Sequence, residues 1–188
     1  TTILPEIISS KEKLGKNKIK IWSAASSSGE EAYSIAMMIN DLIRPKYPNM
    51  EFEIVGTDIS NAVVDVARRA SYKEYSVRNT PVYYLKKYFK TNGTSFDLDP
   101  KIKSMATFKL LNLYDDLSMR TMINHDVIFC ANVLIYFDQT SKIKVINHLY
   151  NSLLKGGYLF IGYSETLHGI SKSFKLTSFP KTIGYKKE

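Results

Sequence analysis

Residues 19–36, IKIWSAASSSGEEAYSIA, read as a strand, a loop of small residues and then a helix. The side chains of residues 23–28 are too small to block a ligand that approaches the backbone, and Gly29 then permits a turn. Ser28 and Glu31 have the spacing of a capping box, which predicts that the helix begins there. Free amides at such a helix start face the ligand pocket of a βα unit, so we expect a ligand at this loop.

The composition of the loop favours a ligand without a pyrophosphate. Residues 19–36 contain neither Gly-x-Gly-x-x-Gly nor a Walker-type Gly-Lys-Ser or Gly-Lys-Thr. Glu30 and Glu31 would also repel phosphate. An acidic helix start suits a ligand that is cationic or rich in hydroxyls and amines. On spacing alone, an ordinary βα turn without a ligand explains the loop equally well.

A second apolar strand, residues 51–57, runs into Asp58 and is followed by a helical pattern. An acid at this strand end is placed to bind the hydroxyls of a ribose. The alternative is that Asp58 caps the next helix, a role that Ser60 or Asn61 would fill as well. Together with the first loop, Asp58 favours a cofactor with a nucleoside, a sulfonium charge and no pyrophosphate. S-adenosylmethionine has these three features.

Length and composition predict one compact domain over residues 1–188. The chain is 44% apolar, which suffices for a single core. Cys130 is its one cysteine, so we predict neither a disulfide framework nor a zinc site, and a reduced, cytoplasmic setting. No apolar run approaches the ~20 residues of a membrane span.

The chain is basic, with a net charge of +8 and a pI near 9.4. Lysines gather in residues 11–20, in 86–90, at 101 and 103, and at the C-terminus. Such charge suits nucleic acid or an acidic protein surface. A solvated lysine-rich face is an equally good interpretation, because the lysines are spread over several segments.

Strand and helix patterns alternate along the chain apart from an irregular region, residues 72–107, and a hairpin pattern ends the chain. This order predicts an α/β fold with a mostly parallel sheet and one antiparallel strand near its edge. In such sheets ligands bind beyond the carboxyl ends of the strands. The polar residues that directly follow apolar runs are Ser23, Asp58, Asn112, Asn132 and Ser164. We expect them to form one pocket.

Five segments, in order and over nearly the whole chain, resemble the chemoreceptor glutamate methyltransferases of the CheR family. They are WSAASSSGEEAYSIA, GTDIS, LNLYD, DVIFCANVLIYFD and LLKGGYLFIGYSET. The resemblance implies a Rossmann-like, S-adenosylmethionine-dependent methyltransferase sandwich with a small β-subdomain. It also implies methyl transfer to glutamate carboxylates on the cytoplasmic helical domain of a bacterial chemoreceptor, with S-adenosylhomocysteine as the second product.

The resemblance also assigns roles to individual residues. Asp58 would hold the ribose, Asn112 and Leu113 would flank the adenine, and the catalytic Tyr136 would face the reacting methyl. Without the motif, core packing would be the favoured interpretation of Tyr136. The implied cofactor-binding residues are Ser23, Ala24, Ala25, Gly29, Glu30, Asp58, Asn112, Leu113, Asn132 and Val133, with no metal ligand. A glutamate with a pKa of ~4.3 is an anionic nucleophile at pH 7, so no general base is required.

Three features depart from the family pattern. The family begins with a helical domain and an Asn-x-Thr-x-Phe-Phe-Arg segment, and this chain starts after both. Ala131 stands where the family usually has arginine. Residues 89–113 match the β-subdomain, but their turn at 91–94 is short, so we predict no tethering by a receptor C-terminal peptide.

Two other functions remain open on the sequence. A nucleic-acid methyltransferase would fit the basic pI, but the strand end Asn132-Val133-Leu134-Ile135 lacks the prolines of base-amino methyltransferases. The stronger rival is a non-catalytic S-adenosylmethionine-binding signalling module, because the missing arginines would allow binding without turnover.

Overall fold

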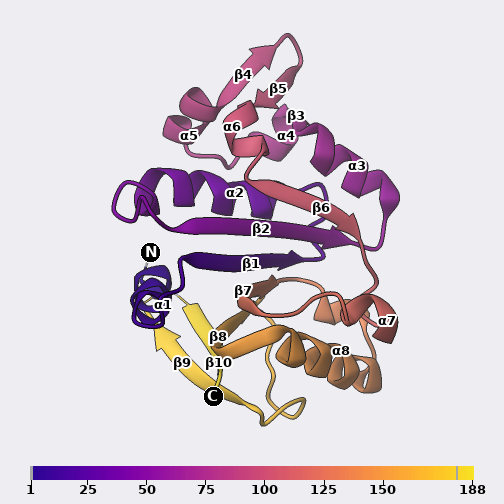
Figure 1. The fold of residues 1–188 in the computed structure, drawn as a ribbon. Coiled ribbons are helices and arrows are strands. Elements are labelled where there is room, and N and C mark those ends of the chain that lie inside the picture. Colours follow the sequence, from indigo (N-terminus) through magenta and orange to yellow (C-terminus); the bar gives the residue numbers. More distant parts are fainter. Residues whose placement is uncertain (1, 181) are drawn as a thin grey trace.

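Seven strands in the order β6-β2-β1-β7-β8-β10-β9 form the main sheet of the computed structural model, which describes residues 2–180 and 182–188 (Figure 1). The strands are β1 Lys18–Ala24, β2 Glu51–Asp58, β6 Ala106–Leu110, β7 His125–Cys130, β8 Leu153–Ile161, β9 Phe174–Phe179 and β10 Thr182–Lys187. Among them β10 alone runs in the opposite direction to the other six strands. The predicted mostly parallel sheet and its terminal hairpin are confirmed.

Side chains of the sheet alternate between two hydrophobic clusters, because successive residues of a strand point to opposite faces. Ile21 packs in the first cluster and Trp22 in the second. The first face is covered by α1 Ile3–Glu12, α2 Glu30–Met38 with its π-helical extension Ile39–Ile43, and α3 Asn61–Arg69. The second is covered by α7 Asp116–Met119 and α8 Gln139–Ser152. The result is an α/β sandwich with a core on each side of the sheet.

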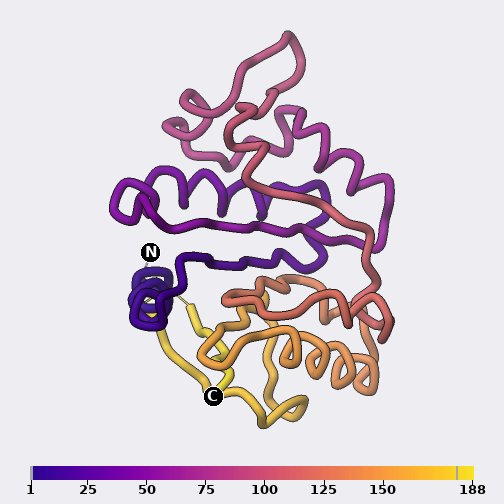
Figure 2. The backbone as a smooth tube through the Cα atoms, viewed as in Figure 1, coloured from indigo at the N-terminus to yellow at the C-terminus, as the bar shows by residue number. Residues whose placement is uncertain are grey.

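A small antiparallel sheet, β3-β5-β4, lies between α3 and β6 in the chain and forms an excursion at one end of the molecule (Figure 2). It consists of β3 Ser71–Lys73, β4 Phe89–Asn92 and β5 Ser95–Leu98, with helices α4 Glu74–Val77, α5 Val82–Tyr88 and α6 Pro100–Lys103. The predicted range 89–113 therefore omits β3, and it includes β6, which pairs with β2 in the main sheet.

The start of α2 corrects the predicted capping box. Gly29, with a φ of 90°, is the N-cap residue and offers no side chain. Glu31 consequently stands at the second helical position, one residue too early to reach back to Ser28. The Ser28 hydroxyl instead donates to the Glu30 carboxylate at 2.8 Å, and the Ser23 hydroxyl donates to Glu31 at 2.6 Å.

The lysine-rich segment 11–20 lies at the amino ends of the parallel strands, opposite their carboxyl ends. Two of its lysines are paired within the chain. Lys11 Nζ lies 2.8 Å from the carboxylate of buried Asp126, and Lys18 Nζ lies 2.6 Å from Glu53. These two charges serve intramolecular ion pairs, which leaves less of the segment to contact a partner. In the described residues no helix is long and apolar enough to cross a membrane.

Candidate functional site

Polar residues gather at the edge of the main sheet where the parallel strands β6, β2, β1, β7 and β8 have their carboxyl ends. Ser23 lies near the end of β1, and Asp58 is the last residue of β2. Asn112, Asn132 and Ser164 lie in the segments that follow β6, β7 and β8. The structure thus places all five of the predicted pocket residues along one edge.

Asp58 fastens the first loop to the end of β2. Its Oδ2 accepts a hydrogen bond from the Ser27 amide, and its Oδ1 accepts one from the Ser60 amide, each at 3.0 Å. The carboxylate is half-buried and retains room for further hydrogen bonds, because an ionised carboxylate has about four lone-pair sites. Ser60, rather than Asp58, is the N-cap residue of α3. The proposed capping role of Asp58 is therefore wrong.

Three residues of this edge adopt the left-handed backbone conformation that L side chains rarely take. Ala25 has a φ of 55°, Ser27 of 51° and Asn132 of 59°. Each costs conformational energy, and such residues cluster where a backbone is held in a fixed shape for a ligand. They follow β1 and β7, which are neighbours in the sheet.

The two glutamates at the start of α2 point to different places. Glu31 accepts from the fully buried Ser23, and burial raises the pKa of its carboxyl. Glu30, one of the predicted cofactor-binding residues, lines a separate cavity of about 290 Å³ between α2 and the small sheet, beside Tyr72 and Tyr84. Glu31 counted in the sequence only as part of an acidic helix start, and it was left out of the predicted cofactor-binding residues because the capping-box pattern assigned its side chain to the helix backbone.

The segment after β6 is held by α8. The Asn112 side chain accepts from the Tyr114 amide at 2.9 Å and so shapes the turn. Leu113 is buried, and its carbonyl lies 2.9 Å from Nδ1 of His148, whose Nε2 lies 2.9 Å from Asp116. Asn112 and Leu113 are thus fixed by contacts on both sides of the turn.

The segment after β7 carries Asn132, Val133 and Tyr136. Tyr136 is 82% exposed on a 3₁₀ turn, Leu134–Tyr136, whereas Leu134 is buried. The core-packing interpretation of Tyr136 is therefore wrong. The amides of Asn132 and Val133 donate to the carboxylate of Glu165. Glu165 is not among the predicted site residues, and the one sequence signal for it is its place in the GYSET segment after β8.

The electrostatics of the edge oppose those of the whole chain. The segments that follow the five strands, residues 23–31, 58–60, 112–116, 131–138 and 162–165, contain no lysine or arginine. Their acidic residues are Glu30, Glu31, Asp58, Asp115, Asp116, Asp138 and Glu165. Lys144 of α8 pairs with Asp116 at 2.9 Å, whereas none of the other six carboxylates takes part in an ion pair within the described residues. In a chain of net charge +8 this edge is therefore locally negative, which favours a cationic ligand over a phosphate.

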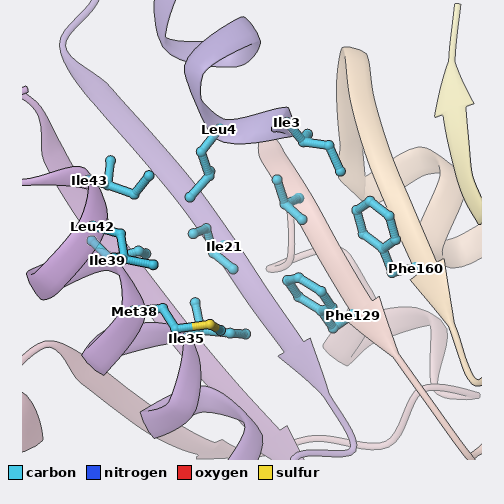
Figure 3. A pocket seen from close by; sticks show the side chains of 11 residues that line it. Ile3, Leu4, Ile21, Ile35, Met38, Ile39, Leu42, Ile43, Phe129 and Phe160 are labelled. Carbon is cyan, nitrogen blue, oxygen red and sulfur yellow. The ribbon is translucent and has the colours of Figure 1, made fainter. Parts of the chain in front are cut away.

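A groove of about 130 Å³ lies elsewhere, on the sheet face between α1 and α2 (Figure 3). Its lining is entirely apolar and includes Ile21, Met38, Phe129 and Phe160. A nucleoside cofactor requires polar groups that fix its orientation. The groove offers none, so it does not compete with the carboxyl edge as a cofactor site.

Residues 1–183 match the family described as CheR methyltransferase, SAM binding domain. The chain belongs to this family. S-adenosylmethionine is accordingly the cofactor of the domain, as the loop and strand-end residues predict. The family assignment also confirms the resemblance drawn from the five sequence segments.

Curated relatives of the chain are named chemotaxis protein methyltransferases. The chain is 38% identical to a chemotaxis protein methyltransferase of Borreliella burgdorferi over 89% of its own length, and 36% identical to chemotaxis protein methyltransferase 2 of Vibrio cholerae over 90%. The chain spans 59% of the length of each of these two relatives.

Solved structures with a similar fold are also methyltransferases. A TehB-like SAM-dependent methyltransferase from Corynebacterium glutamicum superposes with a TM-score of 0.55 at 12% identity, covering 94% of this chain and 84% of that one. A putative O-methyltransferase from Nostoc punctiforme gives a TM-score of 0.54 at 14% identity, covering 98% and 57%. At these identities the likeness supports the fold alone.

The residues at the carboxyl edge fit S-adenosylmethionine. The carboxylate of Asp58 lies beside a loop of small side chains, as a ribose requires, and Glu31 supplies a second, more buried acid. The absence of lysine and arginine from the segments that follow the five strands suits a sulfonium cation and an ammonium group.

Proposed function

We propose that the protein transfers a methyl group from S-adenosylmethionine to glutamate side chains in the cytoplasmic helical domain of a bacterial chemoreceptor. The family to which residues 1–183 belong supports this proposal. The observation that carries it is the locally negative carboxyl edge, where Asp58 is fixed by the amide of Ser27. The alternative of a nucleic-acid methyltransferase has no comparable support at this edge.

The proposal gives each part of the edge a role in binding. The small loop, with Ser23, Ala24, Ala25 and Gly29, would line the methionine end of the cofactor. Asp58 would accept from the ribose hydroxyls, since it retains unused lone pairs. Asn112 and Leu113 would flank the adenine, while Asn132 and Val133 would close the pocket. Between the two glutamates of α2, the geometry favours Glu31 over the predicted Glu30 for the cationic end of the cofactor.

The proposed reaction requires no general base, because the acceptor carboxylate is already an anionic nucleophile. When bound, S-adenosylmethionine would supply an electrophilic methyl carbon, which a carboxylate oxygen can attack directly while the sulfur leaves as a neutral thioether. The chain must therefore align the acceptor and exclude water from it. Tyr136 is exposed on the turn after β7, and in this proposal its hydroxyl would donate a hydrogen bond that orients the acceptor carboxylate. We keep Tyr136 as the proposed catalytic residue.

Two sequence features bear on the acceptor. Ala131 is half-buried and adds no positive charge to the edge. The turn between β4 and β5 consists of Gly93 and Thr94, too short to add a peptide-binding loop. We therefore propose recognition of the receptor's helical domain without capture of a receptor C-terminal peptide.

Methyl-ester formation tests the proposal. The protein is incubated with S-adenosylmethionine labelled in the methyl group and with receptor cytoplasmic domains, and the labelled product is treated with alkali. A glutamyl ester releases labelled methanol, whereas methylated amines or bases keep their label. A receptor whose candidate glutamates are replaced by alanine is the control. Label that resists alkali, or that persists in the control, contradicts the proposal; cofactor binding without any transfer supports the non-catalytic module.

A further inference from the structure

The carboxylate of Glu165 accepts hydrogen bonds from four backbone amides that belong to two different strand ends. Oε1 accepts from Val133 at 3.1 Å and from Leu134 at 2.8 Å. Oε2 accepts from Asn132 at 2.9 Å and from Gly162 at 2.7 Å. One side chain after β8 thereby holds three consecutive residues after β7.

The backbone after β7 is shaped to receive an anion. Asn132 is left-handed, with a φ of 59°, and Val133 follows at φ −120° and ψ −39°. Successive amides in such a turn converge on one point and form a concavity that binds negative charge. Here the anion is a residue of the same chain. No ion pair joins Glu165 to a lysine, arginine or histidine within the described residues, so the amides are its principal counter-charge.

The end of β8, at Gly162, has the shape that its contact with Glu165 requires. A Cβ on Gly162 would lie 2.8 Å from Oε2 of Glu165 and 2.9 Å from the amide nitrogen of Asn132. These distances are shorter than real Cβ contacts, so the two strand ends approach closely because residue 162 is glycine. Gly162 and Glu165 together set the spacing between the ends of β7 and β8.

We propose that Glu165 is a positioning residue of the cofactor site, acting through the backbone of Asn132, Val133 and Leu134. This inference rests on the proposed function, in which Asn132 and Val133 close the cofactor pocket and Tyr136 follows after one 3₁₀ turn. An acid is required because one carboxylate can accept all four amides, whereas an amide side chain would turn an N–H group toward backbone N–H donors.

The first measurement concerns the contact itself and needs no ligand. Hydrogen exchange of the amides of Asn132, Val133, Leu134 and Gly162 is followed in the protein and in Glu165→Ala. We expect these four amides to lose protection while the strands β1 and β2 keep theirs. Unchanged protection of the four amides would overturn the inference.

The second measurement concerns the cofactor site. Affinity for S-adenosylhomocysteine is determined by calorimetry, well below the unfolding temperature, for the protein, Glu165→Gln and Glu165→Ala. Loss of backbone alignment weakens binding by about tenfold or more in Glu165→Ala, with Glu165→Gln between the two because it keeps one acceptor oxygen. Asp99→Asn is the matched control, because Asp99 also accepts a backbone amide, from Lys101, and lies at the start of α6 beside the small sheet, outside the segments of the carboxyl edge.

The outcomes separate this inference from the proposed function. If the unaltered protein fails to bind S-adenosylhomocysteine, the cofactor site is wrong, and the exchange data still decide whether Glu165 holds the two strand ends. If the protein binds and Glu165→Ala binds equally well, the positioning role is wrong. A double variant, Glu165→Ala with Asn132→Ala, should lose less affinity than the sum of the two single losses, because Glu165 acts through the segment that carries Asn132. A loss equal to that sum would show that the two residues act independently and would contradict the positioning role.

Discussion

The amide of Ser27 donates a 3.0 Å hydrogen bond to Oδ2 of Asp58, and this contact joins the loop after β1 to the end of β2. The same carboxylate is the group that we propose for the ribose of the cofactor. Asp58→Ala should therefore weaken S-adenosylhomocysteine binding by about tenfold to a hundredfold, because a hydrogen bond to a charged group contributes ~1.5–3 kcal/mol. Calorimetric titration measures the change. Equal affinity in the variant would remove Asp58 from the site.

Glu31 and Glu30 differ in where their side chains lie, and a pair of variants distinguishes them. Glu31→Gln should weaken S-adenosylhomocysteine binding more than Glu30→Gln, because Glu31 bonds to Ser23 at the edge whereas Glu30 lines the cavity beside the small sheet. Burial raises the pKa of Glu31. Affinity should accordingly fall as the pH is lowered through that raised pKa, and the fall should be absent in Glu31→Gln. The opposite ranking would return the role to Glu30.

His125 makes the stability of the fold depend on pH. Burial lowers its pKa from 6.5 to about 4, because the charged ring is poorly solvated beside Trp22. The unfolded chain then binds more protons than the folded one between these values. The contribution of His125 to the free energy of unfolding is fully present above pH 6.5 and is lost as the pH falls toward 4. The loss amounts to about 3 kcal/mol.

Chemical unfolding at a series of pH values measures this dependence. His125→Phe keeps an aromatic ring against Trp22 and should flatten the slope between pH 6.5 and 4. A slope that is unchanged in His125→Phe would assign the dependence to other groups.

The ion pair between Lys11 and Asp126 ties α1 to β7, with side chains that are 14% and 4% exposed. Lys11→Met leaves the Asp126 charge buried without its cation, so the free energy of unfolding should fall by about 3 kcal/mol. Denaturant unfolding measures the loss, and Lys13→Met, at an exposed position of the same segment, is the control. Equal stability of the two variants would show that the buried Asp126 carboxylate does not need Lys11. Water or the amide of Lys20, which also donates to Asp126, would then be enough to stabilise it.

The fold was predictable because two sequence signals mark each strand of the parallel sheet. Apolar runs such as residues 51–57 mark a strand, and a polar residue such as Asp58 marks its end. Parallel strands have their carboxyl ends at one edge, so the edge residues followed from order along the chain. The helix start at Gly29 could not be predicted in this way. Gly29 has a left-handed φ and is the N-cap, one residue after the predicted Ser28, so Glu31 does not form the predicted capping box.

Glu165 was not predictable for a different reason. Its partners among residues 132–134 lie more than thirty positions away in the sequence, and they are backbone amides that leave no mark on residue identity. The small sheet was displaced in the prediction because β3 has three residues, and one buried residue between two exposed ones is too short an alternation to distinguish a strand from a loop. The contacts of Glu165 and the pairing of β3 with β5 both join segments that are far apart in the sequence.

The most direct test of the central claim is a crystal structure of the protein with S-adenosylhomocysteine. We predict that the ligand lies at the carboxyl edge, with its ribose hydroxyls on Asp58 and its adenine beside Asn112 and Leu113. Ligand in the apolar groove that contains Ile21 and Phe160, or in the cavity beside Glu30, would contradict the claim.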